Sequence, residues 1–152
     1  GKKEFGDYEL KKPSVWTTKI SKVALKGDVL LSVRAPVGET NMNYDKICIG
    51  RGLAAIRANK ENNSEFIYYF LNSVKDQIVG NTGAVFNSIN KKQIENIIIP
   101  TPSLDEQNQI TGNIKQVLSH TKKINLLTKQ KLHNLNILKL SILNKELINT
   151  AA

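Results

Sequence analysis

The stretch Pro100-Thr-Pro-Ser-Leu-Asp-Glu-Gln-Asn-Gln-Ile110 joins two parts of the chain that differ in pattern. Ser103 followed three residues later by Glu106 fits a capping box, in which each side chain bonds a backbone N–H at the start of a helix. Pro100 and Pro102 favour an extended backbone just before it. The stretch therefore predicts the end of a compact segment and the start of a helix.

The segment after this start has the pattern of one long helix. From residue 104 to about residue 148 no proline occurs and the only glycine is Gly112. The helix is expected to exceed about 40 residues, or roughly 60 Å at 1.5 Å per residue. A 3,4 spacing of apolar residues forms a heptad-like stripe along it. The residues expected to form the contact with a partner helix are Ile114, Val117, Ile124, Leu135, Leu138 and Ile142.

What covers this stripe has two possible answers. A domain of about 100 residues has a radius of gyration of about 13 Å, so the predicted helix would extend well beyond it. We therefore expect the stripe to contact a second copy or a partner helix, and packing on the chain's own globular part is the alternative. Thr121, Thr128 and Lys131 weaken the middle of the stripe, which either sets the pairing register or marks a different packing there.

Composition limits the class of protein. The 152 residues suit one domain and one arm, and 40% hydrophobic residues allow a packed core. The single cysteine, Cys48, excludes an intrachain disulfide and a cysteine-based zinc cluster, and we expect it to be a half-buried strand residue. No apolar run approaches the length of a membrane span and no secretory leader is evident. An intracellular protein without membrane contact is expected.

Residues 1–100 show shorter and less regular patterns. The expected elements are strands at residues 28–33, 46–49, 53–57 and 97–99, a helix at residues 64–79 and a short helical turn after residue 90. Asn62 and Glu65 are expected to cap the longer helix, and Gly80 and Asn81 to stop it. Residues 1–26 have no period from which an element can be assigned. The pattern predicts a mixed α+β domain.

The residue types needed for catalysis are sparse. The two histidines, His120 and His133, are 13 residues apart in the predicted helix and do not share a metal-binding face. The segment Gly80-Asn-Thr-Gly83 lacks the lysine and the spacing of a phosphate-binding loop. We therefore expect no catalytic residue, no metal site and no cofactor, and a protein that binds rather than reacts.

Basic residues point to a polyanionic partner. Lys and Arg total 22 against 13 Asp and Glu, a formal net charge of +9. Arg34, Arg51 and Arg57 lie beside glycine-containing turns, where arginine can reach a phosphate or a guanine edge. Lys91 and Lys92 begin the short helical turn and are further candidates for DNA contact. For Arg34 and Arg51, bracing of their own loops is the alternative.

Five blocks of the sequence, in chain order, resemble the specificity subunit of type I restriction-modification systems. They are Gly27-Asp-Val-Leu-Leu-Ser-Val-Arg-Ala-Pro-Val-Gly38 and residues 49–57, 66–71, 83–89 and 97–107. The block Pro-x-Pro-x-Leu-x-Glu-Gln at residues 100–107, leading into a Leu/Ile-rich helix, is the most specific of them. The resemblance covers about residues 27–148.

The resemblance implies a bacterial or archaeal cytoplasmic protein that recognises DNA without catalysing a reaction. It implies a target recognition domain at residues 1–100 that reads one half of a split double-stranded DNA site. It also implies a long helix at residues 101–148 that acts as a spacer and binds the methyltransferase subunit and, through it, the restriction subunit. Family members usually have two such domains and two such helices, so this chain resembles a half subunit whose recognition domain begins late.

The expected architecture is thus an α+β recognition domain followed by a long helix in an antiparallel coiled coil with a second copy. Such a homodimer would have two-fold symmetry and read a palindromic split site. Two other functions remain open at this point. One is a coiled-coil scaffold whose globular part binds protein, and the other is a recognition fragment of a single-chain restriction and methylation enzyme.

Overall fold

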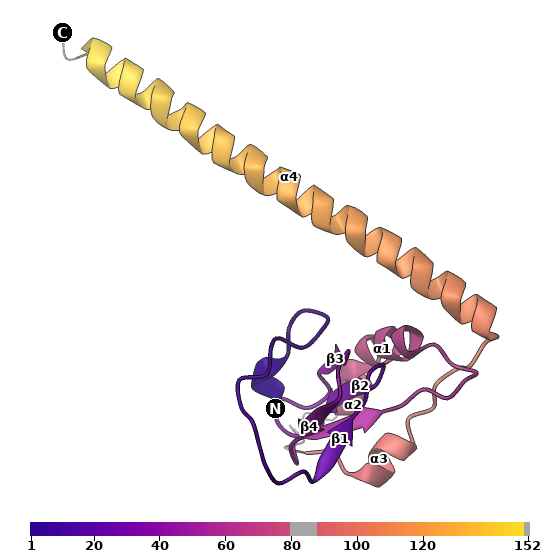
Figure 1. The fold of residues 1–152 in the computed structure, drawn as a ribbon. Coiled ribbons are helices and arrows are strands. Elements are labelled where there is room, and N and C mark those ends of the chain that lie inside the picture. The colour runs from indigo at the N-terminus through magenta and orange to yellow at the C-terminus, as the bar shows by residue number, and fades with distance from the viewer. Residues whose placement is uncertain (80–87, 151–152) are drawn as a thin grey trace. The chain divides into compact units, whose positions relative to one another are not determined.

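The computed structural model describes residues 1–79 and 88–150 (Figure 1). The chain divides into two compact units, Gly1–Thr111 and Gly112–Ala152. The first unit contains all the strands of the described residues, together with the first two turns of the long helix. The second unit is the remainder of that helix.

The centre of the first unit is a three-stranded antiparallel sheet in the order β3-β2-β5. Its strands are β2 (Val29–Ser32), β3 (Thr40–Met42) and β5 (Leu53–Ile56). Val29 lies opposite Met42 on one side and Ile56 on the other, and Ser32 lies opposite Leu53. A second sheet pairs β1 (Lys22–Ala24) with β4 (Ile47–Ile49).

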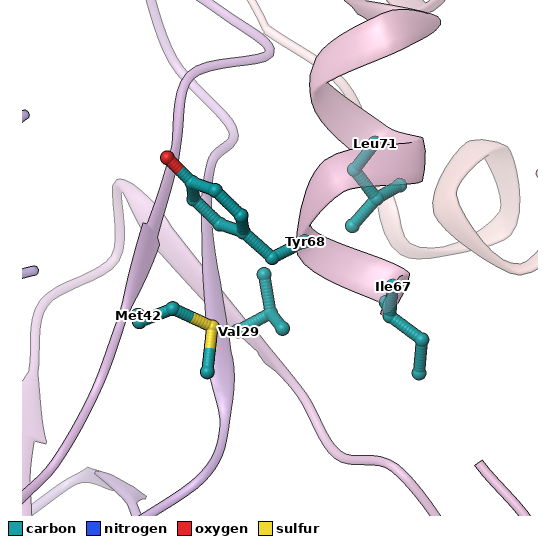
Figure 2. Close-up of a cluster of buried hydrophobic side chains, with 5 residues drawn as sticks. All are labelled: Val29, Met42, Ile67, Tyr68 and Leu71. Carbon is teal, nitrogen blue, oxygen red and sulfur yellow. The ribbon is translucent and has the colours of Figure 1, made fainter. Parts of the chain in front are cut away.

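The core forms on both faces of β2, because its continuous apolar run presents side chains alternately to each face. On one face, Val29 and Met42 of the sheet meet Ile67, Tyr68 and Leu71 of helix α1 (Ser64–Ser73), as Figure 2 shows. Two further apolar clusters of the described residues extend this packing. One contains Leu30, Ala24, Ile49 and Leu53, and the other contains Leu31, Val37 and Ile89. Complete burial of one such side chain contributes about 1.5–3 kcal/mol.

Short helices complete the first unit. They are the 3-10 helix η1 (Lys2–Glu4), α2 (Lys75–Val79) and α3 (Lys91–Glu95). The long helix α4 spans Leu104–Thr150. Its start has the predicted capping box: Ser103 N–H donates to Glu106 Oε2 at 2.9 Å, and Glu106 N–H donates to Ser103 Oγ at 3.3 Å. The predicted helical turn after residue 90 is present as α3, and Asn90 and Gln93 form a capping box at its start.

Several sequence predictions of elements are wrong. Asn63, not Asn62, caps α1, with its Oδ1 accepting from the N–H groups of Glu65 at 2.7 Å and Phe66 at 3.2 Å. The predicted helix at residues 64–79 is broken at Val74 into α1 and α2. The predicted stops at residues 80 and 81 lie outside the described residues.

Residues 97–99 do not form the predicted strand. Ile97 N–H bonds back to the Ile94 carbonyl at the end of α3, so this backbone continues from a helix rather than entering a ladder. Ile97 and Ile99 pack against the core cluster of Figure 2, whereas Ile98 is 89% exposed. The alternation typical of a strand is present, but no strand among residues 1–79 and 88–150 pairs with this segment.

Cys48 also differs from the prediction, because it is exposed on β4 rather than half-buried. The neighbouring side chains of β4 point to the other face, where Ile49 is buried.

The second unit contains a single helix whose side chains from residue 115 to residue 148 are all exposed. Of the predicted contact residues, Ile114 is partly buried, while Val117, Ile124, Leu135, Leu138 and Ile142 are 51–62% exposed. Within residues 1–79 and 88–150, no helix combines the length and apolar character that a membrane span requires.

Candidate nucleic-acid interface

Two of the predicted DNA-contacting residues, Arg34 and Arg51, lie at the same end of the β2–β5 ladder. Val33 N–H donates to the Gly52 carbonyl at 2.9 Å, which brings the residues after β2 beside those before β5. The Arg34 stem passes along Gly52, because a Cβ built at Gly52 would lie 3.9 Å from Arg34 Cδ. The structure therefore brings these two arginines together.

The turn that carries Arg34 is held by a buried hydroxyl. Ser32, 1% exposed, donates from Oγ toward the carbonyl oxygens of Arg34 at 2.9 Å and Pro36 at 3.0 Å. Gly38 N–H returns to the Ser32 carbonyl at 2.9 Å. These contacts fix the backbone of the turn and leave the Arg34 side chain exposed.

Arg51 and Lys91 line one groove of about 680 Å³. The groove is bordered by β1, by the β4–β5 turn and by α3. Figure 1 shows β1 and α3 near the lower edge of the globular unit. Lys22 of β1 is a third cation on its rim. Much of its floor is apolar, formed by Val23, Val33, Ile49, Leu53, Ala54, Ala55, Ile56, Ile89 and Ile94.

The charge around this groove is mainly positive. Among the lining residues that the structure describes, Glu95 is the one acidic residue, and it forms an ion pair with Lys91 at 3.4 Å, with both side chains more than half exposed. An exposed pair of this kind is weak and readily exchanged for another anion. Three cations from three separate elements can therefore meet the phosphates of a single ligand, with Arg51 able to bind two oxygens at once.

Lys92 and Arg57 lie outside this groove. Lys92 is exposed on α3 but is not a lining residue. Arg57 follows β5 at the opposite end of the ladder from Arg51, where its Nε and Nη2 donate to the two carboxylate oxygens of Asp28, both at 2.8 Å. The DNA assignment of both residues stays a prediction.

The Arg57 pair joins a buried carboxylate to a half-exposed guanidinium. Asp28 is 1% exposed, and its Oδ2 also accepts from Leu25 N–H at 2.8 Å. Burial of the carboxyl opposes its ionisation, but the bonds from Arg57 and Leu25 and the Arg57 charge outweigh burial and lower the pKa of Asp28 below its ordinary value. This geometry holds the Gly27 turn, where φ is +89°, against the sheet.

Sequence reasoning missed Lys22. The segment around it has no clear period, and only the pairing of β1 with β4 places Lys22 opposite Ile49 and beside Arg51. The single local signal for a strand here was the short apolar pair Val23-Ala24 that follows Lys22. Within the described part of the chain, no three His, Cys, Asp or Glu side chains are grouped as metal ligands.

The chain thus contains a small antiparallel α+β unit with a cation-rimmed groove and, C-terminal to it in sequence, a long exposed helix. The model of the type I restriction modification DNA specificity domain matches residues 9–136. The chain belongs to this family, which confirms the resemblance seen in the sequence.

Individual relatives agree. A putative type I restriction enzyme MjaX specificity subunit from Methanocaldococcus jannaschii is 46% identical over 120 residues, covering 77% of this chain and 28% of the relative. A chain from a structural study of complex assembly and conformational transition of the type I R-M system matches with a TM-score of 0.82 and 37% identity, covering 95% of this chain and 36% of that one.

The HsdS subunit from Thermoanaerobacter tengcongensis matches with a TM-score of 0.69 and 38% identity, covering 79% of this chain and 29% of that one. The predicted α+β domain with a long C-terminal helix is thus confirmed, with the helix pairing remaining a prediction. The chain spans about a third of the length of these relatives.

Proposed function

We propose that this chain recognises one half of a bipartite DNA site for a type I restriction-modification complex. The recognition domain, residues 1–100, contacts double-stranded DNA. The long helix, residues 101–148, binds the methyltransferase subunit and, through it, the restriction subunit. Catalysis belongs to those partners, and the assembly works in the bacterial or archaeal cytoplasm where its DNA lies.

The observation that carries this proposal is the groove rimmed by Lys22, Arg51 and Lys91. Duplex DNA presents phosphates at regular spacing, and cations on separate elements match such an extended polyanion better than they match one small anion. Arg34 at the edge of the groove adds a guanidinium on a braced turn. An arginine on a fixed backbone suits contact with a base edge, because its fork must be held in register.

The helix supports the partner part of the proposal. Leu135, Leu138 and Ile142 form one exposed stripe, and Ile137 and Leu140 lie roughly 140–200° around the helix axis from Leu135. These two are 53% and 60% exposed. A helix with apolar residues on two opposite sides needs a packing partner on each side. We assign the first stripe to an antiparallel second copy and the second stripe to the methyltransferase subunit.

The first test measures mass by light scattering after size exclusion. The chain alone is expected to be a dimer, and addition of the methyltransferase subunit encoded beside its gene is expected to give a larger stoichiometric complex. A monomer that ignores the methyltransferase subunit would contradict both helix assignments. A dimer that ignores it and binds no DNA would favour the coiled-coil scaffold.

The second test measures DNA affinity against salt. The duplex carries the motif found by sequencing methylated sites in a host that makes both subunits. Arg51→Ala is expected to weaken binding about tenfold and to reduce the salt slope by about one, since one phosphate contact is lost. Lys60→Ala removes the same charge from an exposed position outside the groove and serves as the control. Equal effects of the two variants would remove the groove from the DNA-binding surface.

A further inference from the structure

Gln107 in the first turns of α4 is fully buried, although glutamine is mostly found at protein surfaces. It lies within the globular unit, Gly1–Thr111, so its contacts are internal to that unit. Its neighbours Asn108 and Gln109 are exposed. A buried amide among exposed polar residues needs partners for both its oxygen and its nitrogen.

The partners of Gln107 come from two separate loops. Its Oε1 accepts from Asn63 N–H at 2.9 Å, and its Nε2 donates to the Pro102 carbonyl at 2.9 Å. Nε2 also lies 3.3 Å from the Glu61 carbonyl and from Asn62 Oδ1. The backbone N–H of Asn63 can only donate and the Pro102 carbonyl can only accept, so the two ends of the amide have fixed roles.

The loop that Gln107 holds is the start of α1. Asn63 is the N-cap of α1, and its Nδ2 donates to Asn108 Oδ1 at 2.7 Å. Two consecutive residues of α4 therefore bind the residue that begins α1. Because α1 carries Ile67 and Leu71 of the core, these bonds connect the base of α4 to the packed centre of the domain.

The capping contacts at the start of α4 have a more local reach. Ser103 and Glu106 bond to each other and are exposed. Gln107 differs because, besides Pro102, it binds Glu61, Asn62 and Asn63, which lie 44–46 residues earlier in the chain and precede α1. Its role is therefore larger than helix capping.

We propose that Gln107 is a positioning residue that fixes the first turns of α4 to the N-cap of α1 and thereby narrows the allowed spacing between two DNA half-sites. This rests on the proposed function. A tilt of about 10° at the base of a helix roughly 70 Å long would displace its far end by on the order of 10 Å. At about 3.4 Å per base pair that displacement equals roughly three base pairs. Spacer length is thus sensitive to this one side chain.

The test sequences methylated sites in a host that makes the methyltransferase subunit with each variant of the full chain. The wild-type chain is expected to methylate a split motif with one spacer length. Gln107→Ala is expected to keep the same half-site bases and to raise methylation at spacers longer or shorter by one base pair about tenfold. Gln109→Ala, two residues away and exposed, is the matched control and is expected to keep the single spacer.

Two conservative variants guard against a folding defect, which thermal melting detects. Gln107→Glu keeps the acceptor for Asn63 and loses the donor for Pro102, and Asn108→Ala removes only the bond to Asn63 Nδ2. Asn108→Ala is expected to broaden the spacer less than Gln107→Ala does, whereas Gln107→Glu, whose buried carboxylate would face the Pro102 and Glu61 carbonyls, is expected to broaden it at least as much. An unchanged single spacer in every folded variant at residues 107 and 108 would overturn the proposal.

Hydrogen exchange of the chain alone separates this proposal from the proposed function. The Asn63 amide is expected to exchange at least tenfold faster in Gln107→Ala than in Gln109→Ala. If the wild-type chain yields no split motif, the proposed DNA function is contradicted. If Gln107→Ala also leaves the exchange rate of the Asn63 amide unchanged, the proposed role of Gln107 is contradicted as well. If the wild-type chain yields a split motif, and Gln107→Ala changes neither the spacer length nor the exchange of the Asn63 amide, only the proposed role of Gln107 is contradicted.

Discussion

The two units of this chain treat apolar residues in opposite ways. In Gly1–Thr111, Leu30 and Leu71 are 0% exposed and belong to packed clusters. In the helical unit, Leu135 and Leu138 are 51% and 55% exposed. The first unit buries the apolar residues of β2 and α1 internally, although Trp16, Ile20 and Ile98 are exposed. The second leaves its apolar residues exposed along its length, which supports the proposed pairing of this helix with a partner surface.

The largest expected effect is on dimer association through the helical unit. Leu135→Lys with Leu138→Lys places four charges at a dimer interface and removes four buried leucines, each worth about 1.5–3 kcal/mol. Association is expected to weaken at least about a thousandfold, while thermal unfolding of the globular unit stays unchanged. Light scattering over a dilution series measures the first quantity, and an unchanged dimer mass would disprove the pairing of this stripe.

The matched control uses the opposite side of the same helix. Ile137→Lys with Leu140→Lys adds the same charge to equally exposed positions. This variant is expected to remain a dimer and to lose binding of the methyltransferase subunit. If it dissociates the dimer instead, the two stripes have been assigned to the wrong partners.

The next largest expected effect is on the free energy of unfolding of the globular unit. Leu30→Ala empties a site in the cluster with Ala24, Ile49 and Leu53, and is expected to lower the free energy of unfolding by about 2–5 kcal/mol. Leu132→Ala, at a helix position that is 60% exposed, removes the same atoms and is expected to leave unfolding of the globular unit unchanged. Denaturant unfolding of both variants measures the contrast, and equal losses would mean that the units do not differ in this way.

A smaller effect on stability is expected from the buried carboxylate of Asp28. The pKa of Asp28 is lowered in the folded state, so the folded chain holds the Asp28 proton less tightly than the unfolded chain does. The resulting stability is present above the unfolded value of about 3.9 and is lost as the pH falls through the folded value. Asp28→Asn is expected to cost about 1–3 kcal/mol at pH 7 and less at low pH. Denaturant unfolding from pH 2 to 7 checks the convergence, and a constant difference would contradict it.

The smallest effect separates a contact made for the fold from one made for a partner. Lys91→Ala removes an exposed ion pair with Glu95 and is expected to leave the midpoint of thermal unfolding unchanged. The same variant is expected to weaken DNA binding severalfold, because Lys91 borders the groove. A shift in the midpoint together with unchanged DNA affinity would give Lys91 a structural role.

The features predicted well from the sequence are those encoded by adjacent residues. The apolar run of β2 predicts a buried strand, and the Ser103 and Glu106 pair predicts the start of α4, because strand burial and capping depend on neighbours in the chain. The long helix follows from the lack of proline over its length.

The features missed depend on contacts between distant residues. β3 was not predicted because its central residue, Asn41, is polar, yet it is fully buried and donates to the Gly6 carbonyl at 2.9 Å. Arg57 resembled the other arginines in its local sequence, and only the fold shows that Asp28 lies beside it. Lys22 joins the groove for the same reason, since β1 pairs with a strand 25 residues later.

The exposed thiol of Cys48 has a practical consequence. It is the single cysteine of the chain, so a maleimide dye attaches at one known place on β4 without any substitution. In a dimer that carries a donor dye on one copy and an acceptor dye on the other, energy transfer reports the distance between the two labelled strands. Antiparallel helices roughly 60 Å long would separate the dyes and give weak transfer, whereas parallel helices would bring them together and give strong transfer.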